Sequence, residues 1–152
     1  MGNRGIGLKD LIETRIIGAV RGLLAGRVNE ILQEMESAVP VIEFGDYCGA
    51  GSIVPVIELA SCERTEKERI VQLDAYSLTV RFSLPENPDG ELYCYAYSGA
   101  FSRAIYDDPS LGGITDRAVI TGKKYIAPPM KHCGDGWSLE ISLRITVEEM
   151  NK

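Results

Sequence analysis

One histidine and four cysteines are the residues of this chain with the richest chemistry. His132 stands directly before Cys133, whereas Cys48, Cys62 and Cys94 are widely spaced along the sequence. A cysteine nucleophile needs an imidazole within hydrogen-bond reach of its sulfur, and adjacent residues seldom point at each other. Structural zinc sites usually combine pairs of closely spaced ligands, which these positions do not offer. The sequence therefore predicts no Cys–His nucleophile, no metal site and no cofactor.

Glycine-rich stretches and acidic side chains are two further candidates for chemistry. The segments GDYCGAGS and GDGW lack the G-x-x-x-x-G-K-[ST] pattern of a phosphate-binding loop. Several acidic residues could form a carboxylate pair, but none has a positioned partner in the sequence: Glu63, Glu66, Glu68, Asp107 and Asp108. Charged side chains without such partners are typical of a solvated surface. We therefore expect a protein that is not an enzyme and that works by presenting surfaces.

The overall composition predicts a soluble globular protein with a single domain over residues 1–152. Apolar residues make up 45% of the chain and charged residues 25%, which is typical of globular proteins. The net charge of −6 argues against nucleic acid as the main partner, because such partners usually require a basic face. The most apolar stretch, IIGAVRGLLAG, is broken by Arg21 and is too short to span a bilayer. With no signal peptide pattern, we expect reduced thiols and no membrane contact.

Residues 8–36 have the apolar spacing of an amphipathic helix, with a break expected near Gly26. Gly18, Gly22 and Gly26 recur every four residues and so share one helix face. Each glycine costs about 1 kcal/mol relative to alanine in a helix. Two interpretations remain: close packing in the core, or a small-residue contact with a neighbouring subunit.

The rest of the chain predicts strands, a second helix and further strands. Residues 39–45 are compatible with a short strand, and residues 53–60 form an expected strand that Pro55 places at a sheet edge or a strand start. Residues 72–84 and 137–148 alternate apolar and polar side chains, which indicates half-buried strands, and residues 114–127 form another. Residues 91–108 form the second helix, and residues 61–69 a charged connection. The order helix, strands, helix, strands predicts an α+β fold: an antiparallel or mixed sheet with helices on one face.

The connector DDPSLGG joins the second helix to the next strand. Pro109 ends the helix, because it disfavours helical geometry at the preceding residue. Two acids at a helix C-terminus oppose the helix dipole at about 0.3–1 kcal/mol, so a turn hydrogen bond or an external contact is expected to retain them. Leu111 is expected to anchor the turn in the core, and Gly112 and Gly113 to adopt backbone angles that other residues resist.

The motifs in this order resemble the tail terminator, or tail completion, proteins of long-tailed bacteriophages and prophages. The segments that carry the resemblance are LIETRIIGAV, AYSLTV at residues 75–80, DPSLGG at residues 108–113, and a strand that starts at Trp137 and ends in ITVE. The resemblance covers residues 8–149, but residues 39–52 match no part of the family pattern.

The resemblance implies a minor tail protein of the virion that is assembled in the cytoplasm of the bacterial host. Such a protein forms a ring, typically of six copies, that stops growth of the tail tube and offers its other face to the head connector. Its partners are then further copies of itself, the tube protein and the connector protein, while DNA passes through an acidic lumen without specific binding. The candidate interaction residues lie in and after the connector: Asp107, Asp108, Leu111, Gly112, Gly113 and Arg117.

Three other functions remain open. The chain could be another head–tail joining or baseplate component, which the sequence does not separate from a terminator. It could be a small metal- or thiol-dependent enzyme that uses Cys133 and His132. It could also be a small-ligand binding module on an α+β scaffold, although no dedicated pocket residues are evident.

Overall fold

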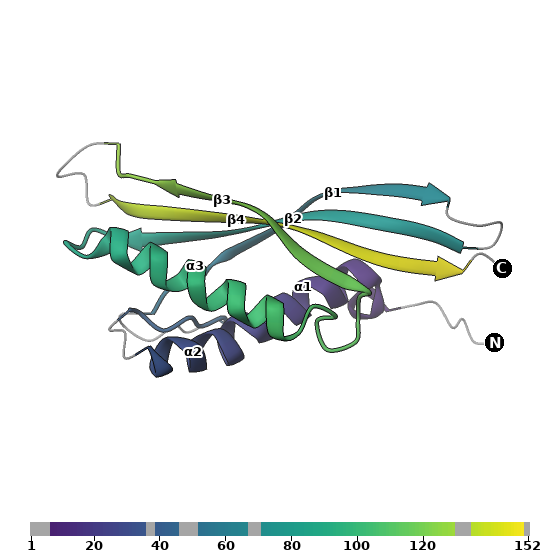
Figure 1. The fold of residues 1–152 in the computed structure, drawn as a ribbon, viewed down its shortest axis with the longest axis horizontal. Helices are drawn as coiled ribbons and strands as arrows, with labels where there is room; N and C mark the ends of the chain where they lie inside the picture. The colour runs from purple at the N-terminus through teal and green to yellow at the C-terminus, as the bar shows by residue number, and fades with distance from the viewer. Residues whose placement is uncertain (1–6, 36–38, 46–51, 67–70, 130–134, 151–152) are drawn as a thin grey trace.

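A computed structural model shows a sheet with all its helices on one face (Figure 1). The structure describes residues 7–35, 39–45, 52–66, 71–129 and 135–150. The four strands are antiparallel and lie in the order β1-β2-β4-β3. The predicted α+β fold with helices packed on one face of the sheet is therefore confirmed.

The sheet consists of β1 (Val56–Glu66), β2 (Val71–Pro85), β3 (Arg117–Ile126) and β4 (Asp135–Met150). β1 starts directly after Pro55 and lies at one edge, as predicted from the missing proline N–H. β2 and β4 are the long central pair, with Phe82 opposite Leu139 and Leu78 opposite Leu143. The strand twist carries the two ends of the sheet out of one plane (Figure 1).

One face of β2 and β4 packs against the helices and forms the sheet side of the core, as the alternation of apolar and polar residues along these strands predicts. The apolar side chains of this face are almost fully buried: Tyr76, Leu78, Val80, Phe82, Leu139, Ile141, Leu143 and Ile145. The helices cover them with a matching set: Ile16, Val20, Leu24, Val28, Cys94, Tyr97, Phe101 and Ala104. The rings of Phe82 and Tyr97 stack with their centroids 5.2 Å apart, which joins the helix layer to the sheet.

The first helical region is continuous but changes its geometry where the glycines occur. It runs from a short 3₁₀ turn, η1 (Leu8–Asp10), through α1 (Ile12–Leu23), a π-helical turn, η2 (Leu24–Val28), and α2 (Asn29–Glu34). The π-helical turn contains Gly26, so the expected break is a local widening of the helix. Asn29 uses its side-chain amide to bond both the N–H and the C=O of Ile42, which ties the following segment to the helix.

The glycine face of this helix does not pack closely within the subunit. A Cβ added at Gly18, Gly22 or Gly26 would meet no atom within 4 Å, and Gly18 and Gly22 are exposed. The interpretation that these glycines serve core packing is therefore wrong for the described part of the chain. Contact of this glycine face with a neighbouring subunit stays a prediction.

Two predicted segments differ from the structure. The expected charged connection at residues 61–69 is wrong in its first part, because β1 continues to Glu66 and pairs with β2 along Ser61–Glu66. The pairing of Arg64 with Asp74 contributes to this extension, since it gives a charged strand residue a buried partner. Residues 39–45 contribute a single parallel bridge, Ile42 with Ile53, and no strand.

Candidate assembly surfaces

The connector after α3 (Gly90–Asp107) is organised by the carboxylate of Asp108. Its Oδ2 accepts a hydrogen bond from the Gly112 N–H at 2.9 Å, and its Oδ1 accepts one from the Ser110 hydroxyl at 3.1 Å. The Ser110 hydroxyl in turn accepts a bond from the Gly113 N–H at 3.1 Å. Asp108 is therefore retained by hydrogen bonds within the turn, which is one of the two explanations expected from the sequence.

Leu111 anchors this turn in the core, as expected. Its side chain is buried although its backbone is left-handed, with φ 52°, and Gly112 and Gly113 follow with φ 71° and 87°. A left-handed conformation costs a residue with a Cβ about 1–2 kcal/mol. Burial of a leucine side chain contributes about 1.5–3 kcal/mol, so the anchor offsets the strain at its own position. The two glycines adopt the same region without that cost.

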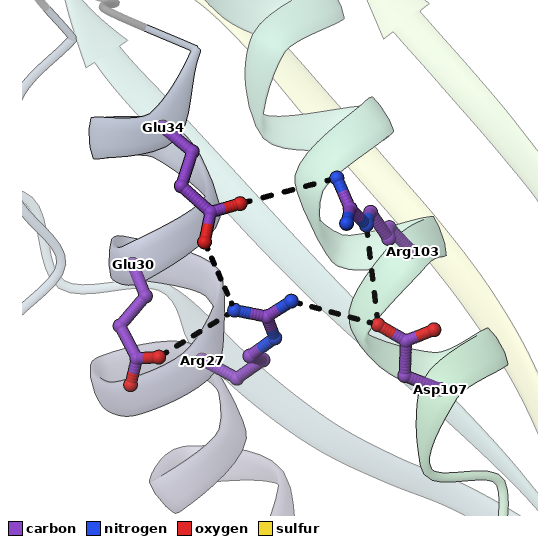
Figure 2. Close-up of polar contacts among 5 residues, drawn as sticks. All are labelled: Arg27, Glu30, Glu34, Arg103 and Asp107. Carbon is purple, nitrogen blue, oxygen red and sulfur yellow. Dashed lines mark hydrogen bonds and ion pairs between the residues drawn. The ribbon is translucent and has the colours of Figure 1, made fainter.

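Asp107 belongs to an ion-pair network between the first helical region and α3 (Figure 2). Its Oδ2 lies 3.7 Å from Arg27 and 3.9 Å from Arg103. Arg27 also contacts Glu30 at 3.5 Å and Glu34 at 3.4 Å, while Arg103 reaches the second oxygen of Glu34 at 3.9 Å. Acids and bases therefore alternate around a closed circuit that joins α2 to α3. The charge of Asp107 at the C-terminus of α3 is therefore balanced by arginines of the same subunit. The sequence around Asp107 does not predict its pairing with Arg27.

Arg117, the last of the predicted interaction residues, is separate from the turn. It is exposed at the start of β3 and lies on the rim of an open cavity of about 440 Å³ between α3 and β3. The cavity walls are mostly apolar and include Ile105, Tyr106, Ala118 and Ile120. The connector therefore joins two elements whose outer sides form a groove, a feature that no single sequence motif predicts.

The face of the sheet opposite the helices is open and polar. Its central positions carry small hydroxylated side chains: Ser77, Thr79, Ser83, Ser138, Ser142 and Thr146. The strand register and alternation place four acids and four bases on the same face: Glu58, Glu63, Glu140, Glu148, Arg81, Arg117, Lys124 and Arg144. Arg81 bridges this face by lying 3.8 Å from both Glu58 and Glu140. The charges balance, so this face alone does not provide the acidic lumen that the resemblance led us to expect.

A polar cluster lies on the helix side of the sheet, beyond the main core. Asp74 is almost fully buried and accepts two hydrogen bonds from Arg64, at 2.6 and 2.7 Å. These bonds lower the pKa of the Asp74 carboxyl. Next to it, the Tyr76 hydroxyl donates to Glu13 of α1 at 3.0 Å, and partial burial together with this acceptor raises the pKa of Tyr76. The cluster joins α1 to β1 and β2.

The described thiols are not activated for chemistry. Burial and the nearby Asp74 raise the pKa of Cys62, and burial raises the pKa of Cys94 to about 11. A nucleophilic cysteine instead needs a lowered pKa. In the ranges that the structure describes, no three His, Cys, Asp or Glu residues are grouped to hold a metal ion. His132, Cys133 and Cys48 lie outside the described residues.

No protein-family model matches this chain, and no curated protein matches it. Among the described helices, none has the length and apolar character needed to cross a membrane.

Proposed function

We propose that this chain is a tail terminator-like structural protein of a long-tailed bacteriophage or prophage. It forms a ring of copies that caps the tail tube and joins it to the head connector. The observation that carries the proposal is the sheet with one uncovered face of small hydroxylated side chains, backed on its other face by helices. A wall of this kind suits the lining of a lumen, because it is polar, hydrated and supported by helices on its other side.

The charge balance of the open face supports a passage for DNA. A strongly basic wall would bind phosphates through counterion release. On the open face, Arg81 lies between Glu58 and Glu140, so a basic side chain is held by two carboxylates. A genome passing such a wall would meet little net attraction.

The ordered connector also supports the proposal. The turn DPSLGG carries the most specific part of the resemblance, and its aspartate, leucine and glycines each have a defined structural role. These roles fix the path from α3 into β3 and so the position of Arg117 at the sheet edge. The turn therefore holds Arg117 and the start of β3 in a fixed position at the outer edge of the sheet.

Deletion of the gene in the phage or prophage that carries it tests the proposal by electron microscopy. A terminator predicts overlong tails without heads, because tube growth no longer stops. Tails of normal length joined to heads would contradict the proposed function. Heads that lack tails, beside tails of normal length, would instead favour the alternative of a head–tail joining component.

A further inference from the structure

The open cavity between α3 and β3, which we call the α3–β3 groove, has apolar walls and a basic rim. Its volume of about 440 Å³ is in the range of clefts that bind ligands. Two bases and no acid line it, Arg117 and Lys123. The apolar walls are formed by Ile105, Tyr106, Pro109, Ala118, Val119 and Ile120.

The two bases of the groove are available to a ligand. Neither Arg117 nor Lys123 forms an ion pair with a described residue, whereas the acids nearest to them in the sequence are engaged. Asp107 pairs with two arginines, at 3.7 and 3.9 Å, and Asp108 accepts hydrogen bonds within the connector. Asp116 accepts a hydrogen bond of 2.7 Å from a backbone N–H of β4. The groove therefore presents positive charge beside its apolar walls.

The walls of the groove are fixed before a ligand binds. The Ala118 N–H donates to the carbonyl oxygen of Pro109 at 2.6 Å, which ties β3 to the connector. The buried side chain of Leu111 holds the same connector in the core. A preformed site loses little conformational entropy on binding. A ligand in the groove contacts side chains, so it leaves the Ala118–Pro109 bond in place and needs no free N–H group of β3.

A second surface of the chain has the complementary chemistry. Residues 86–92, with the sequence ENPDGEL, form the turn before α3 and the start of that helix, and we call them the acidic tip. The tip has no base and three exposed acids, Glu86, Asp89 and Glu91. Among these carboxylates, Leu92 is 63% exposed. The apolar walls of the groove suit the leucine, and its bases suit the acids.

The acidic tip is also held in a fixed shape. The side-chain oxygen of Asn87 accepts a hydrogen bond from the Asp89 N–H at 2.7 Å, and its carbonyl oxygen accepts one from the Gly90 N–H at 3.0 Å. Gly90 packs against Trp137, because an added Cβ would lie 3.0 Å from the indole ring. Leu92 is therefore presented by an ordered turn.

The tip and the groove lie towards opposite ends of α3 (Figure 1). Leu92 and Tyr106 are 14 positions apart, which corresponds to about 21 Å along the helix axis. One copy therefore cannot place its own tip in its own groove. A contact between the tip of one copy and the groove of another joins two different surfaces. Such head-to-tail contacts close into a ring when the rotation between copies permits it.

We infer that the α3–β3 groove of one copy receives the acidic tip of the next copy. Leu92 packs between α3 and β3 of the groove, and the carboxylates of the tip lie near Arg117 and Lys123. The inference rests on the ring of the proposed function, and it names the two surfaces through which the copies associate.

Mixing two variants tests the contact, because each copy contributes a groove to one neighbour and a tip to the other. The groove variant carries Arg117→Glu and Lys123→Glu and keeps a native tip. The tip variant carries Leu92→Ser and Glu86→Lys and keeps a native groove. All four positions are exposed, so both variants are expected to fold, and circular dichroism checks that they do.

Analytical ultracentrifugation at the highest attainable concentration gives the readout. We expect assemblies larger than a dimer from the native chain and monomers from each variant alone. The mixture should give a dimer and nothing larger, because it contains one native tip for one native groove. A mixture that stays monomeric, or a native chain that never exceeds a dimer, would overturn the inferred contact.

A matched control replaces another exposed leucine. Leu8 is 81% exposed and belongs to neither surface. The single change Leu92→Ser should weaken association by about tenfold, as truncation of an interface anchor does. Leu8→Ser should leave association unchanged. An effect of Leu92→Ser no larger than that of Leu8→Ser would overturn the role of Leu92 as the anchor.

An acidic segment of the tube protein is the alternative occupant of the groove. Co-sedimentation of each variant with purified tail tubes separates the two. If the tube protein fills the groove, the groove variant loses tube binding and the tip variant binds tubes as the native chain does. That result would overturn the inferred contact.

The outcomes also separate this contact from the proposed function. A dimer that forms only in the mixture supports the contact, even if gene deletion leaves tail length unchanged and so refutes the terminator. Overlong tails after gene deletion, together with a mixture that stays monomeric, support the terminator and refute the contact.

Discussion

Replacement of Gly112 by alanine should destabilise the protein, whereas the same replacement at Gly18 should stabilise it. Neither added Cβ would meet another atom within 4 Å, so steric collision does not separate the two sites. The difference is the backbone: Gly112 has φ 71°, while Gly18 lies inside α1. The left-handed position costs alanine about 1–2 kcal/mol, and the helical position gains about 1 kcal/mol.

Thermal unfolding followed by circular dichroism measures both changes. A domain of this size shifts its Tm by about 2–4 °C per kcal/mol. We therefore expect Gly112→Ala to lower the Tm by about 2–8 °C and Gly18→Ala to raise it by about 2–4 °C. Valine at Gly112 should lower it further, because a β-branched residue resists positive φ. A Gly112→Ala protein as stable as the native one would refute this account of the connector.

Two further predictions concern the polar cluster around Asp74 and the start of β4. Arg64 lowers the pKa of Asp74, so the folded protein keeps this carboxylate ionised at a lower pH than the unfolded chain does. The ionised carboxylate therefore stabilises the folded state above about pH 4, and this stabilisation is lost as the pH falls through the folded-state pKa. The difference in urea midpoint between native protein and Asp74→Asn should therefore shrink below about pH 4, and a constant difference would contradict this. Gly136→Ala should cost about 1–3 kcal/mol in thermal unfolding, because its Cβ would collide with the carbonyl oxygens of Leu84 and Pro85; a native Tm would contradict that close approach.

The sequence predicts the layers of this fold well, because they follow from local periodicity. The strict alternation from Trp137 to Glu148 identifies β4 and its core face, and Pro55 correctly places β1 at an edge. The burial of Leu111 and the left-handed glycines after it were also predictable, since turn chemistry is local.

The errors arise where a distant partner decides the structure. β1 continues through Arg64 because Asp74, ten residues away, gives it a buried partner. Asp107 is balanced by Arg27, which is 80 positions earlier in the chain. Neither pairing follows from local propensity, and both need the assembled sheet and helix layers.

The candidate interaction residues likewise combine a local feature, which the sequence predicts, with a long-range one, which it does not. The sequence places Arg117 after the connector, but it does not show that Glu63 shares its row of the sheet. Strand order and register are long-range properties.

The proposed function requires copies of this chain to form a ring on a tail tube. Native mass spectrometry of the purified chain, alone and after incubation with purified tail tubes of the same phage, measures both the ring and its binding. We expect a closed ring, with six copies the expected number, bound to tube ends. A chain that remains monomeric and unbound in the presence of tubes would contradict it.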